Sequence, residues 1–181
     1  MSGTLFLVVG PSGAGKDTLI EGARRALADD PRFVFPRRVI TRPRDAGGEA
    51  HDAIAIDEFR IAQQRDAFAL SWDAHGLCYG IPRAIEGHLA AARHVVVNVS
   101  RAVIPAARMR YQALTIIEVW APVSVLAARL AARGRESVEE IAGRLDRSSP
   151  VVMEGRDVRR VENSGSVADG VSAMLGALTA G

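Results

Sequence analysis

The fold is decided by the stretch Leu5-Phe6-Leu7-Val8-Val9 and the residues that follow it, Gly10-Pro11-Ser12-Gly13-Ala14-Gly15-Lys16-Asp17-Thr18. The apolar run predicts a buried strand, and Thr18-Leu19-Ile20-Glu21 begins a helix-like stretch after the loop. Between a strand and a helix, this spacing of two glycines and a lysine is that of a phosphate-binding loop, which surrounds an anion with backbone N–H groups. We therefore predict that the residues from Gly10 to Thr18 contact the phosphates of ATP or GTP.

Lys16 is the single lysine of the chain, and the other 22 of its 23 Lys and Arg residues are arginines. A phosphate loop needs a compact ammonium on a flexible stem, whereas a guanidinium is planar and bulky. The position of this lysine therefore favours a phosphate loop over a fortuitous glycine turn.

The residue after the lysine departs from the usual phosphate-loop pattern. Most such loops carry Ser or Thr there, whose hydroxyl ligates Mg²⁺, but this chain has Asp17. The strand predicted at His94–Val99 shows the reverse departure, because it offers Asn98 where a magnesium-holding Asp is usual. We hypothesise that the negative partner of Mg²⁺ has moved to the phosphate loop, and predict Asp17 and Asn98 as metal-site residues.

Composition indicates one domain that binds small anionic molecules. A chain of 181 residues with 48% apolar residues can bury one full core, with room for small inserted subdomains. A net charge of +2, dispersed arginines and 5% aromatic residues argue against nucleic acid as a partner. The single cysteine, Cys78, suits a reducing cytoplasm, and neither a signal-like start nor a membrane-length apolar run is present.

Apolar strand candidates alternate with helix-like stretches. The expected strands are Leu5–Val9, Val34–Ile40, His94–Val99, Leu114–Trp120 and Val158–Val161. The expected helices are Lys16–Ala28, Asp57–Arg65, Pro82–Ala92, Ala102–Tyr111, Val123–Arg133, Val138–Arg147 and Val167–Leu178. Helix starts are indicated by Pro82 in a first turn, by Ser137 ahead of Glu140 and by Ser166 ahead of Asp169. The alternation predicts an α/β fold with a parallel sheet flanked by helices.

Two excursions interrupt this alternation. Loop-like residues from Thr41 to Glu49, followed by short segments at Ile54–Ile56, Phe68–Trp72 and Leu77–Ile81, predict an inserted lobe. Arginine-rich residues from Arg133 to Ser137 separate two helices and predict a lid. We therefore expect one domain with its core at 1–40 and 82–181, an acceptor-binding lobe at about 41–81 and a lid at about 133–146.

Arginines gather in both excursions. Arg129 and Arg133 lie four residues apart on one helix face, and Arg135, Arg144 and Arg147 can converge with them. The alternative is a solvated face paired with glutamates, but beside a phosphate loop we favour a lid that stabilises a transferring phosphoryl group. Arg42 and Arg44 indicate a second anion site, unless they lie in an ordinary exposed turn. His51 beside them is weak evidence, since a lone His is as often a structural hydrogen-bond partner.

Several segments resemble the guanylate-kinase-like P-loop NTPase fold: Gly10–Lys16, Thr41-Arg42-Pro43, Gly48-Glu49 and Tyr79-Gly80. Further segments are similar to one branch of it, the ribose 1,5-bisphosphate phosphokinases of bacterial phosphonate catabolism: Gly15-Lys16-Asp17, Glu49-Ala50-His51, Phe68–Ile81, Val97-Asn98-Val99-Ser100-Arg101 and Arg133-Gly134-Arg135-Glu136. The similarity runs through nearly the whole chain.

This resemblance implies a reaction in which ATP phosphorylates ribose 1,5-bisphosphate to give ADP and 5-phosphoribosyl 1-diphosphate. The acceptor is already ionised, so positioning and charge neutralisation suffice, with Mg²⁺ as cofactor. The catalytic residues it implies are Lys16, Arg129, Arg133, Arg135 and Arg144. The substrate-binding residues are Arg42, Arg44, His51, Ser71, Tyr79, Ser100 and Arg101.

Departures from guanylate kinases bear on the acceptor. Those enzymes read the guanine edge with carboxylates where this chain has Ser71 and Ser100, and their phosphate-binding tyrosine after Gly-Glu has no counterpart in His51-Asp52-Ala53-Ile54. A guanylate or other nucleoside monophosphate kinase remains an alternative. A non-catalytic guanylate-kinase-like module that binds a protein is a third, disfavoured by the intact Lys16 loop.

Overall fold

The computed structural model describes residues 2–43, 50–132 and 153–180. Arg44 and the lid arginines Arg133, Arg135 and Arg144 lie outside the described residues. So do the helix expected at Val138–Arg147 and the start expected at Ser137.

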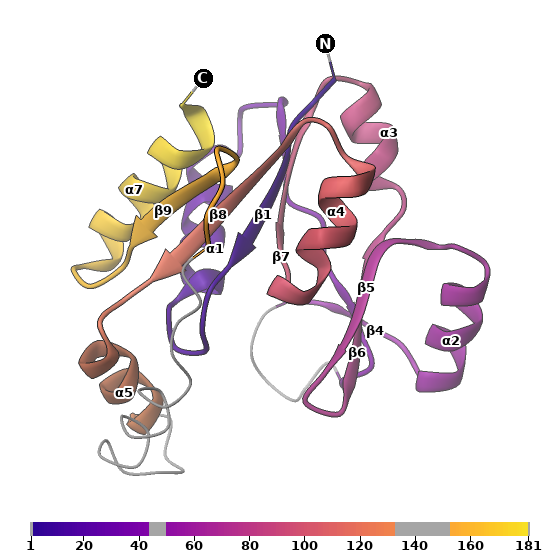
Figure 1. Cartoon of the computed structure of the whole chain (residues 1–181), viewed down its shortest axis with the longest axis horizontal. Coiled ribbons are helices and arrows are strands. Elements are labelled where there is room, and N and C mark those ends of the chain that lie inside the picture. The colour runs from indigo at the N-terminus through magenta and orange to yellow at the C-terminus, as the bar shows by residue number, and fades with distance from the viewer. Residues whose placement is uncertain (1, 44–49, 133–152, 181) are drawn as a thin grey trace. The chain divides into compact units, whose positions relative to one another are not determined.

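A five-stranded sheet has the order β2-β7-β1-β8-β9. Figure 1 labels each of these strands except β2. Its strands are β1 (Leu5–Val9), β2 (Phe33–Val34), β7 (His94–Asn98), β8 (Leu114–Trp120) and β9 (Val158–Glu162). The pairs β2–β7 and β8–β9 are parallel, as the alternation of strands and helices predicts. Every residue of β1 is buried, which explains why it reads as an unbroken apolar run rather than an alternating one.

The helices around these strands are α1 (Lys16–Ala26), α3 (Ile85–Ala90), α4 (Ile104–Arg110), α5 (Val123–Ala131) and α7 (Val167–Thr179), and a 3₁₀ turn η1 (Arg101–Val103) precedes α4. The start of α7 is confirmed: the Ser166 hydroxyl accepts from the Asp169 N–H, and the Asp169 carboxylate accepts from the Ser166 N–H. No helix in the described part of the chain is long and apolar enough to cross a membrane.

The chain forms two compact units. The first comprises Met1–Leu7 and Leu27–Thr115, and the second comprises Val8–Ala26 and Ile116–Gly181. The boundary passes through β1, so the phosphate loop and α1 belong to the second unit, whereas the predicted acceptor lobe belongs to the first. The division into core, lobe and lid stays a prediction.

A smaller sheet forms where the sequence predicts the inserted lobe. Its order is β4-β3-β6-β5, with β3 (Val39–Ile40), β4 (Asp52–Ala53), β5 (Phe68–Ala74) and β6 (Leu77–Pro82). The helix α2 (Ile56–Gln64) packs Phe59 against Phe68 and Cys78, and the two phenylalanine rings stack with centroids 4.6 Å apart. Burial raises the pKa of the Cys78 thiol, which behaves as a small core residue.

Two expectations about these elements are wrong. Val34–Ile40 is not one strand, because β2 and β3 belong to different sheets and Pro36 between them cannot donate a ladder hydrogen bond. Pro82 does not start a helix, because it pairs with Phe68 at the end of β6.

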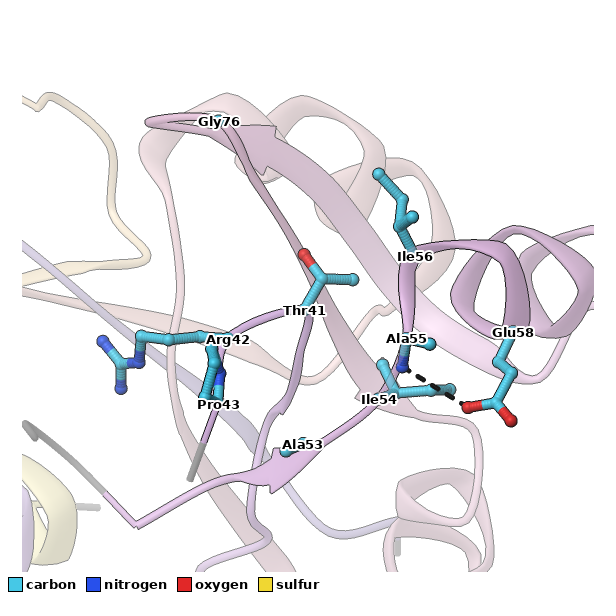
Figure 2. Close-up of a pocket in the computed structure, with 9 residues that line it drawn as sticks. All are labelled: Thr41, Arg42, Pro43, Ala53, Ile54, Ala55, Ile56, Glu58 and Gly76. Atoms are coloured by element: carbon cyan, nitrogen blue, oxygen red, sulfur yellow. Dashed lines mark hydrogen bonds between the residues drawn. The ribbon is translucent and has the colours of Figure 1, made fainter. Parts of the chain in front are cut away.

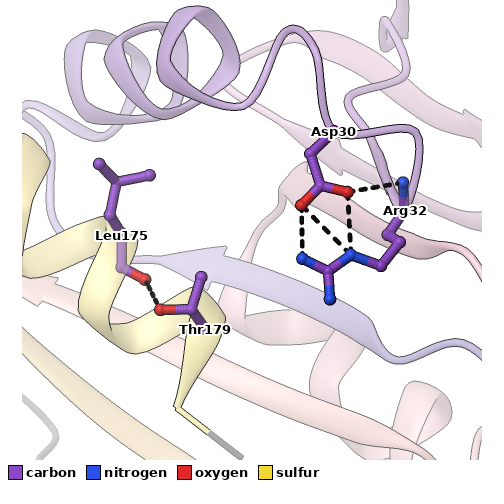
Figure 3. A network of polar contacts seen from close by, with 4 residues as sticks. All are labelled: Asp30, Arg32, Leu175 and Thr179. Atoms are coloured by element: carbon purple, nitrogen blue, oxygen red, sulfur yellow. Dashed lines mark hydrogen bonds and ion pairs between the residues drawn. The ribbon is translucent and has the colours of Figure 1, made fainter.

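Figure 3 shows two local polar contacts that involve none of the predicted site residues. In the first unit, the Arg32 guanidinium donates to both oxygens of Asp30 and lowers the pKa of that carboxyl to about 2. The Arg32 carbonyl accepts from the His94 N–H at 2.6 Å, which joins this turn to β7. In the second unit, the Thr179 hydroxyl donates to the Leu175 carbonyl at 2.9 Å near the end of α7.

The contact between α1 and α7 supplies a test of the fold. A Cβ on Gly22 of α1 would lie 2.3 Å from Cγ2 of Val171, a side chain with one strongly preferred rotamer in a helix. We expect Gly22→Ala to lower the free energy of unfolding by about 1–2 kcal/mol, because overpacking outweighs the higher helix propensity of alanine. Chemical denaturation monitored by circular dichroism measures this change.

The matched control is Gly176→Ala on α7, where an added Cβ meets nothing within 4 Å. We expect it to raise the free energy of unfolding by roughly 0.5 kcal/mol through helix propensity alone. Equal stabilisation by both substitutions would contradict the close approach of α1 and α7.

Candidate functional site

The loop between β1 and α1 has the backbone of an anion cradle. Gly13 has φ 84° and Gly15 has φ 87°, values that side-chain-bearing residues rarely adopt. The helix α1 begins immediately afterwards at Lys16, so its first N–H groups and its positive dipole end face the loop. This arrangement suits phosphate oxygens.

Lys16 holds its charge over the loop. Its Nζ donates to the carbonyls of Gly10 at 2.8 Å and Pro11 at 3.0 Å. Asp17 and Thr18 lie in the first turn of α1, and both are exposed. Lys16 and Asp17 are adjacent in sequence and therefore place an ammonium and a carboxylate at the start of α1.

Asn163, the residue after β9, supports the loop through a hydrogen bond to its backbone. This side chain is 5% exposed, and its Nδ2 donates to the carbonyl of Ala14 at 2.8 Å. Its own N–H donates to the Trp120 carbonyl at 2.9 Å. A Cβ on Gly15 would lie 2.4 Å from Nδ2, and one on Gly170 of α7 would lie 2.6 Å from Oδ1. Sequence reasoning missed Asn163, because 149 residues separate it from its partner in the loop.

Arg129 comes to the same loop from α5. A Cβ on Gly15 would lie 4.0 Å from its Nη1, and this nitrogen is buried without a hydrogen-bond partner among the described residues. A buried donor without an acceptor costs free energy, so the position suits an anionic oxygen of a ligand. Of the four arginines predicted to be catalytic, Arg129 alone lies among the described residues.

The second basic centre, in the first unit, is built from Arg42 and His51. His51 is 6% exposed, and its Nε2 lies 2.9 Å from the Arg42 carbonyl while its Nδ1 lies 3.3 Å from Arg42 Nη2. A carbonyl only accepts, so the geometry assigns the proton to Nε2 and makes Nδ1 the acceptor for the guanidinium. The Arg42 Nε is buried without a hydrogen-bond partner among the described residues. His51 therefore fixes the direction of Arg42.

A hollow of about 470 Å³ lies in the same lobe. Figure 2 shows the Arg42 guanidinium extending away from the side formed by Ile54, Ile56 and Glu58. Glu58 instead turns toward the Ala55 N–H, at 3.4 Å. Of the predicted acceptor-binding residues, Arg42 lines this hollow, whereas Tyr79 and Ser71 do not. The lining of this hollow therefore does not bring the predicted acceptor-binding residues together.

The register of β5 and β6 separates two of the predicted residues. Tyr79 is paired with Trp72, and the two rings stack with centroids 5.3 Å apart and planes 3° from parallel. Ser71, one position earlier, faces the other side of the sheet, where its hydroxyl accepts from Gln63 of α2 at 3.0 Å. The structure thus does not bring Ser71 together with Tyr79.

The remaining predicted residues lie at the carboxyl end of β7. The Ser100 hydroxyl accepts from the Ala102 N–H at 3.3 Å and caps the 3₁₀ turn that begins at Arg101. Asn98, half-buried at the end of β7, accepts a hydrogen bond at its backbone carbonyl from Arg38. Among the described residues, no group of three or more His, Cys, Asp and Glu side chains is placed to hold a metal ion.

Comparisons with known proteins identify the family. No protein-family model matches this chain. The ribose 1,5-bisphosphate phosphokinase PhnN of Agrobacterium fabrum is 48% identical over 165 residues, covering 91% of this chain and 90% of that protein. The protein of the same name from Acidiphilium cryptum is 56% identical over 151 residues, covering 83% and 80%.

A longer relative and a solved structure complete the comparison. The chain matches 26% of a bifunctional ribose 1,5-bisphosphokinase-thymidine phosphorylase of Azorhizobium caulinodans, at 48% identity over 99% of its own length. The crystal structure of guanylate kinase from Anaplasma phagocytophilum superposes with a TM-score of 0.66 over 98% of this chain and 85% of that one, at 16% identity. The chain therefore belongs to the ribose 1,5-bisphosphate phosphokinase family and has the fold of guanylate kinases.

Proposed function

We propose that this chain transfers the γ-phosphoryl group of ATP to ribose 1,5-bisphosphate, giving ADP and 5-phospho-α-D-ribose 1-diphosphate in phosphonate degradation. The observation that carries the proposal is the match to relatives of that name over 90% of the Agrobacterium fabrum protein. A bond forms between an oxygen of the acceptor's 1-phosphate and the γ-phosphorus, and the bond to the β–γ bridging oxygen breaks. We expect the reaction in the cytoplasm, which the single cysteine suits.

The proposed donor site uses the second unit's residues in distinct roles. The backbone N–H groups from Gly10 to Thr18 bind the phosphates, and the Lys16 ammonium moves from the loop carbonyls to the transferring phosphoryl group. Arg129 donates its buried Nη1 to a phosphate oxygen. Outside the described residues, we assign the same charge-neutralising role to Arg133, Arg135 and Arg144.

The proposed acceptor site lies in the first unit. Arg42, fixed by His51, and Tyr79 bind the reacting phosphate. Arg44, Ser100 and Arg101 remain proposed acceptor contacts. Ser71 has the weakest support, since its hydroxyl bonds to Gln63 on the opposite face from Tyr79.

The residues at the loop fit a magnesium ion in one respect: Asp17, in the first turn of α1, is an exposed carboxylate, and Mg²⁺ takes oxygen ligands. When bound, Mg²⁺ neutralises charge on the donor's phosphate oxygens. Asp17 is our proposed protein ligand, and Asn98 remains a separate candidate at the end of β7. Asp17 needs such a cation, because a carboxylate next to triphosphate is otherwise repelled.

Removing the Asp17 charge tests this metal assignment. We expect Asp17→Asn to raise the Mg²⁺ concentration for half-maximal turnover by at least roughly tenfold, the loss typical of a disrupted metal site. Magnesium titrations of initial rate and of ATP binding by calorimetry measure it. The control is Asp29→Asn, an exposed carboxylate after α1. Unchanged magnesium dependence and turnover in Asp17→Asn would show that the metal's partner has not moved to the loop.

The support of the loop by Asn163 gives a second test of the donor site. We expect Asn163→Ala to weaken ATP binding about threefold to tenfold, because the Ala14 carbonyl loses its donor. Asn163→Asp should weaken binding further, since a carboxylate oxygen would face both that carbonyl and the phosphates. Nucleotide titrations measure the affinity, and thermal melts measure the stability.

The control for Asn163 is Ser164→Ala, which removes an exposed hydroxyl that donates to Glu162 on the same turn. It should leave ATP affinity unchanged. Wild-type ATP affinity in both Asn163 variants would rule out this role for the side chain.

The choice of acceptor is decided by competition. A steady-state assay offers ribose 1,5-bisphosphate, GMP and ribose 5-phosphate together with ATP. We expect preferential turnover of ribose 1,5-bisphosphate, because Ser71 and Ser100 supply no carboxylate for a guanine edge. Preferred turnover of GMP would favour the guanylate kinase alternative instead. No ATP turnover with any acceptor would favour a non-catalytic binding module.

A further inference from the structure

In the first unit, the Arg38 guanidinium lies over two aromatic rings, and we call these three side chains the cationic platform. Its guanidinium carbon lies 5.3 Å from the centroid of the Tyr79 ring and 5.9 Å from that of the Trp72 ring. These two rings are the stacked, nearly parallel pair of β5 and β6. A guanidinium over aromatic faces is attracted by their quadrupoles and loses conformational freedom.

A second contact fixes the same guanidinium. Its Nη1 donates to the backbone carbonyl of Asn98 at 3.3 Å, in a half-buried position at the carboxyl end of β7. Arg38 therefore joins the small sheet to the end of β7, where Ser100 also lies. The contacts pre-organise a positive charge instead of leaving it on a mobile surface side chain.

Strand pairing brings the residues of this platform together. Ile40 of β3 is paired with Tyr79 of β6, and Arg38, which lies just before β3, reaches the Tyr79 ring from the same segment. Arg42 lies two residues after Ile40, and His51 fixes it separately. The small sheet thus supports two guanidinium groups, each held by its own partners.

Two separately held cations match a ligand with two separated anions. The reacting phosphate is assigned to Arg42 and Tyr79, which leaves the second phosphate of the acceptor without a partner. A planar guanidinium suits phosphate oxygens through charge-assisted hydrogen bonds. We propose that Arg38, held over Trp72 and Tyr79, binds the non-reacting 5-phosphate and selects a bisphosphorylated sugar. This inference rests on the proposed function.

The test compares two acceptors that differ only in the 5-phosphate. We expect Arg38→Gln to raise the KM for ribose 1,5-bisphosphate roughly 10- to 100-fold, the loss expected for a charge-assisted hydrogen bond. The KM for ribose 1-phosphate and the KM for ATP should stay within about twofold of wild type. Arg38→Lys should recover part of the preference for the bisphosphate, because it keeps the charge without the planar fork.

Arg110→Gln is the matched control. Arg110 also places its guanidinium over an aromatic ring, that of Tyr111 at 5.7 Å, and donates to a backbone carbonyl, that of Ala69 at 3.1 Å. If Arg38 is only a structural contact, Arg38→Gln and Arg110→Gln should change thermal stability and the KM values for both acceptors by similar amounts. The control should leave the ratio of the two acceptor KM values unchanged.

The outcomes separate this inference from the proposed function. Equal losses of Arg38→Gln on both acceptors, with a wild type that uses ribose 1,5-bisphosphate, would overturn the role of Arg38 alone. A wild type that binds the bisphosphate in calorimetry without turnover would overturn the proposed function, and the Kd values of the variant would still test Arg38. A wild type that does not bind the bisphosphate would overturn both.

Discussion

The tight backbone turn between β1 and α1 is the constraint on which the rest of the second unit depends. Left-handed backbone at Gly13 and Gly15 turns the loop so that the helix can begin at Lys16, directly after the strand. The loop carbonyls are then satisfied by side chains, with Lys16 on Gly10 and Pro11 and Asn163 on Ala14. Side chains from α1 and from the residue after β9 thus both stabilise this turn.

In the first unit, the arginines contact partners of different kinds. The Arg42 guanidinium donates to Nδ1 of His51, and the Arg38 guanidinium lies over the Trp72 and Tyr79 rings. Elsewhere in the unit, Arg60 pairs with Asp73 and Arg110 pairs with Glu86.

The sequence predicted the α/β class, the guanylate-kinase-like fold and the family, and the topology and the comparisons confirm them. The boundaries of β1, β7 and β8 also followed closely, because long buried runs bounded by turn residues are strong local signals. The strand predicted at Val34–Ile40 merges β2 with β3, and no strand was predicted at β4. Strands this short have no periodicity of their own, and their pairing with β6 and with each other determines them.

Local chemistry was determined by sequence alone: where a loop must turn, where an ammonium follows it, and where a strand is buried on both faces. These features depend on neighbouring residues and on backbone geometry. Tertiary structure alone decided that Asn163 supports the loop, that Ser71 and Tyr79 face opposite sides of the small sheet, and that Arg38 lies over Trp72 and Tyr79. Each of these depends on strand register or on a contact between distant segments, and a shift of one residue would reverse which side chains meet.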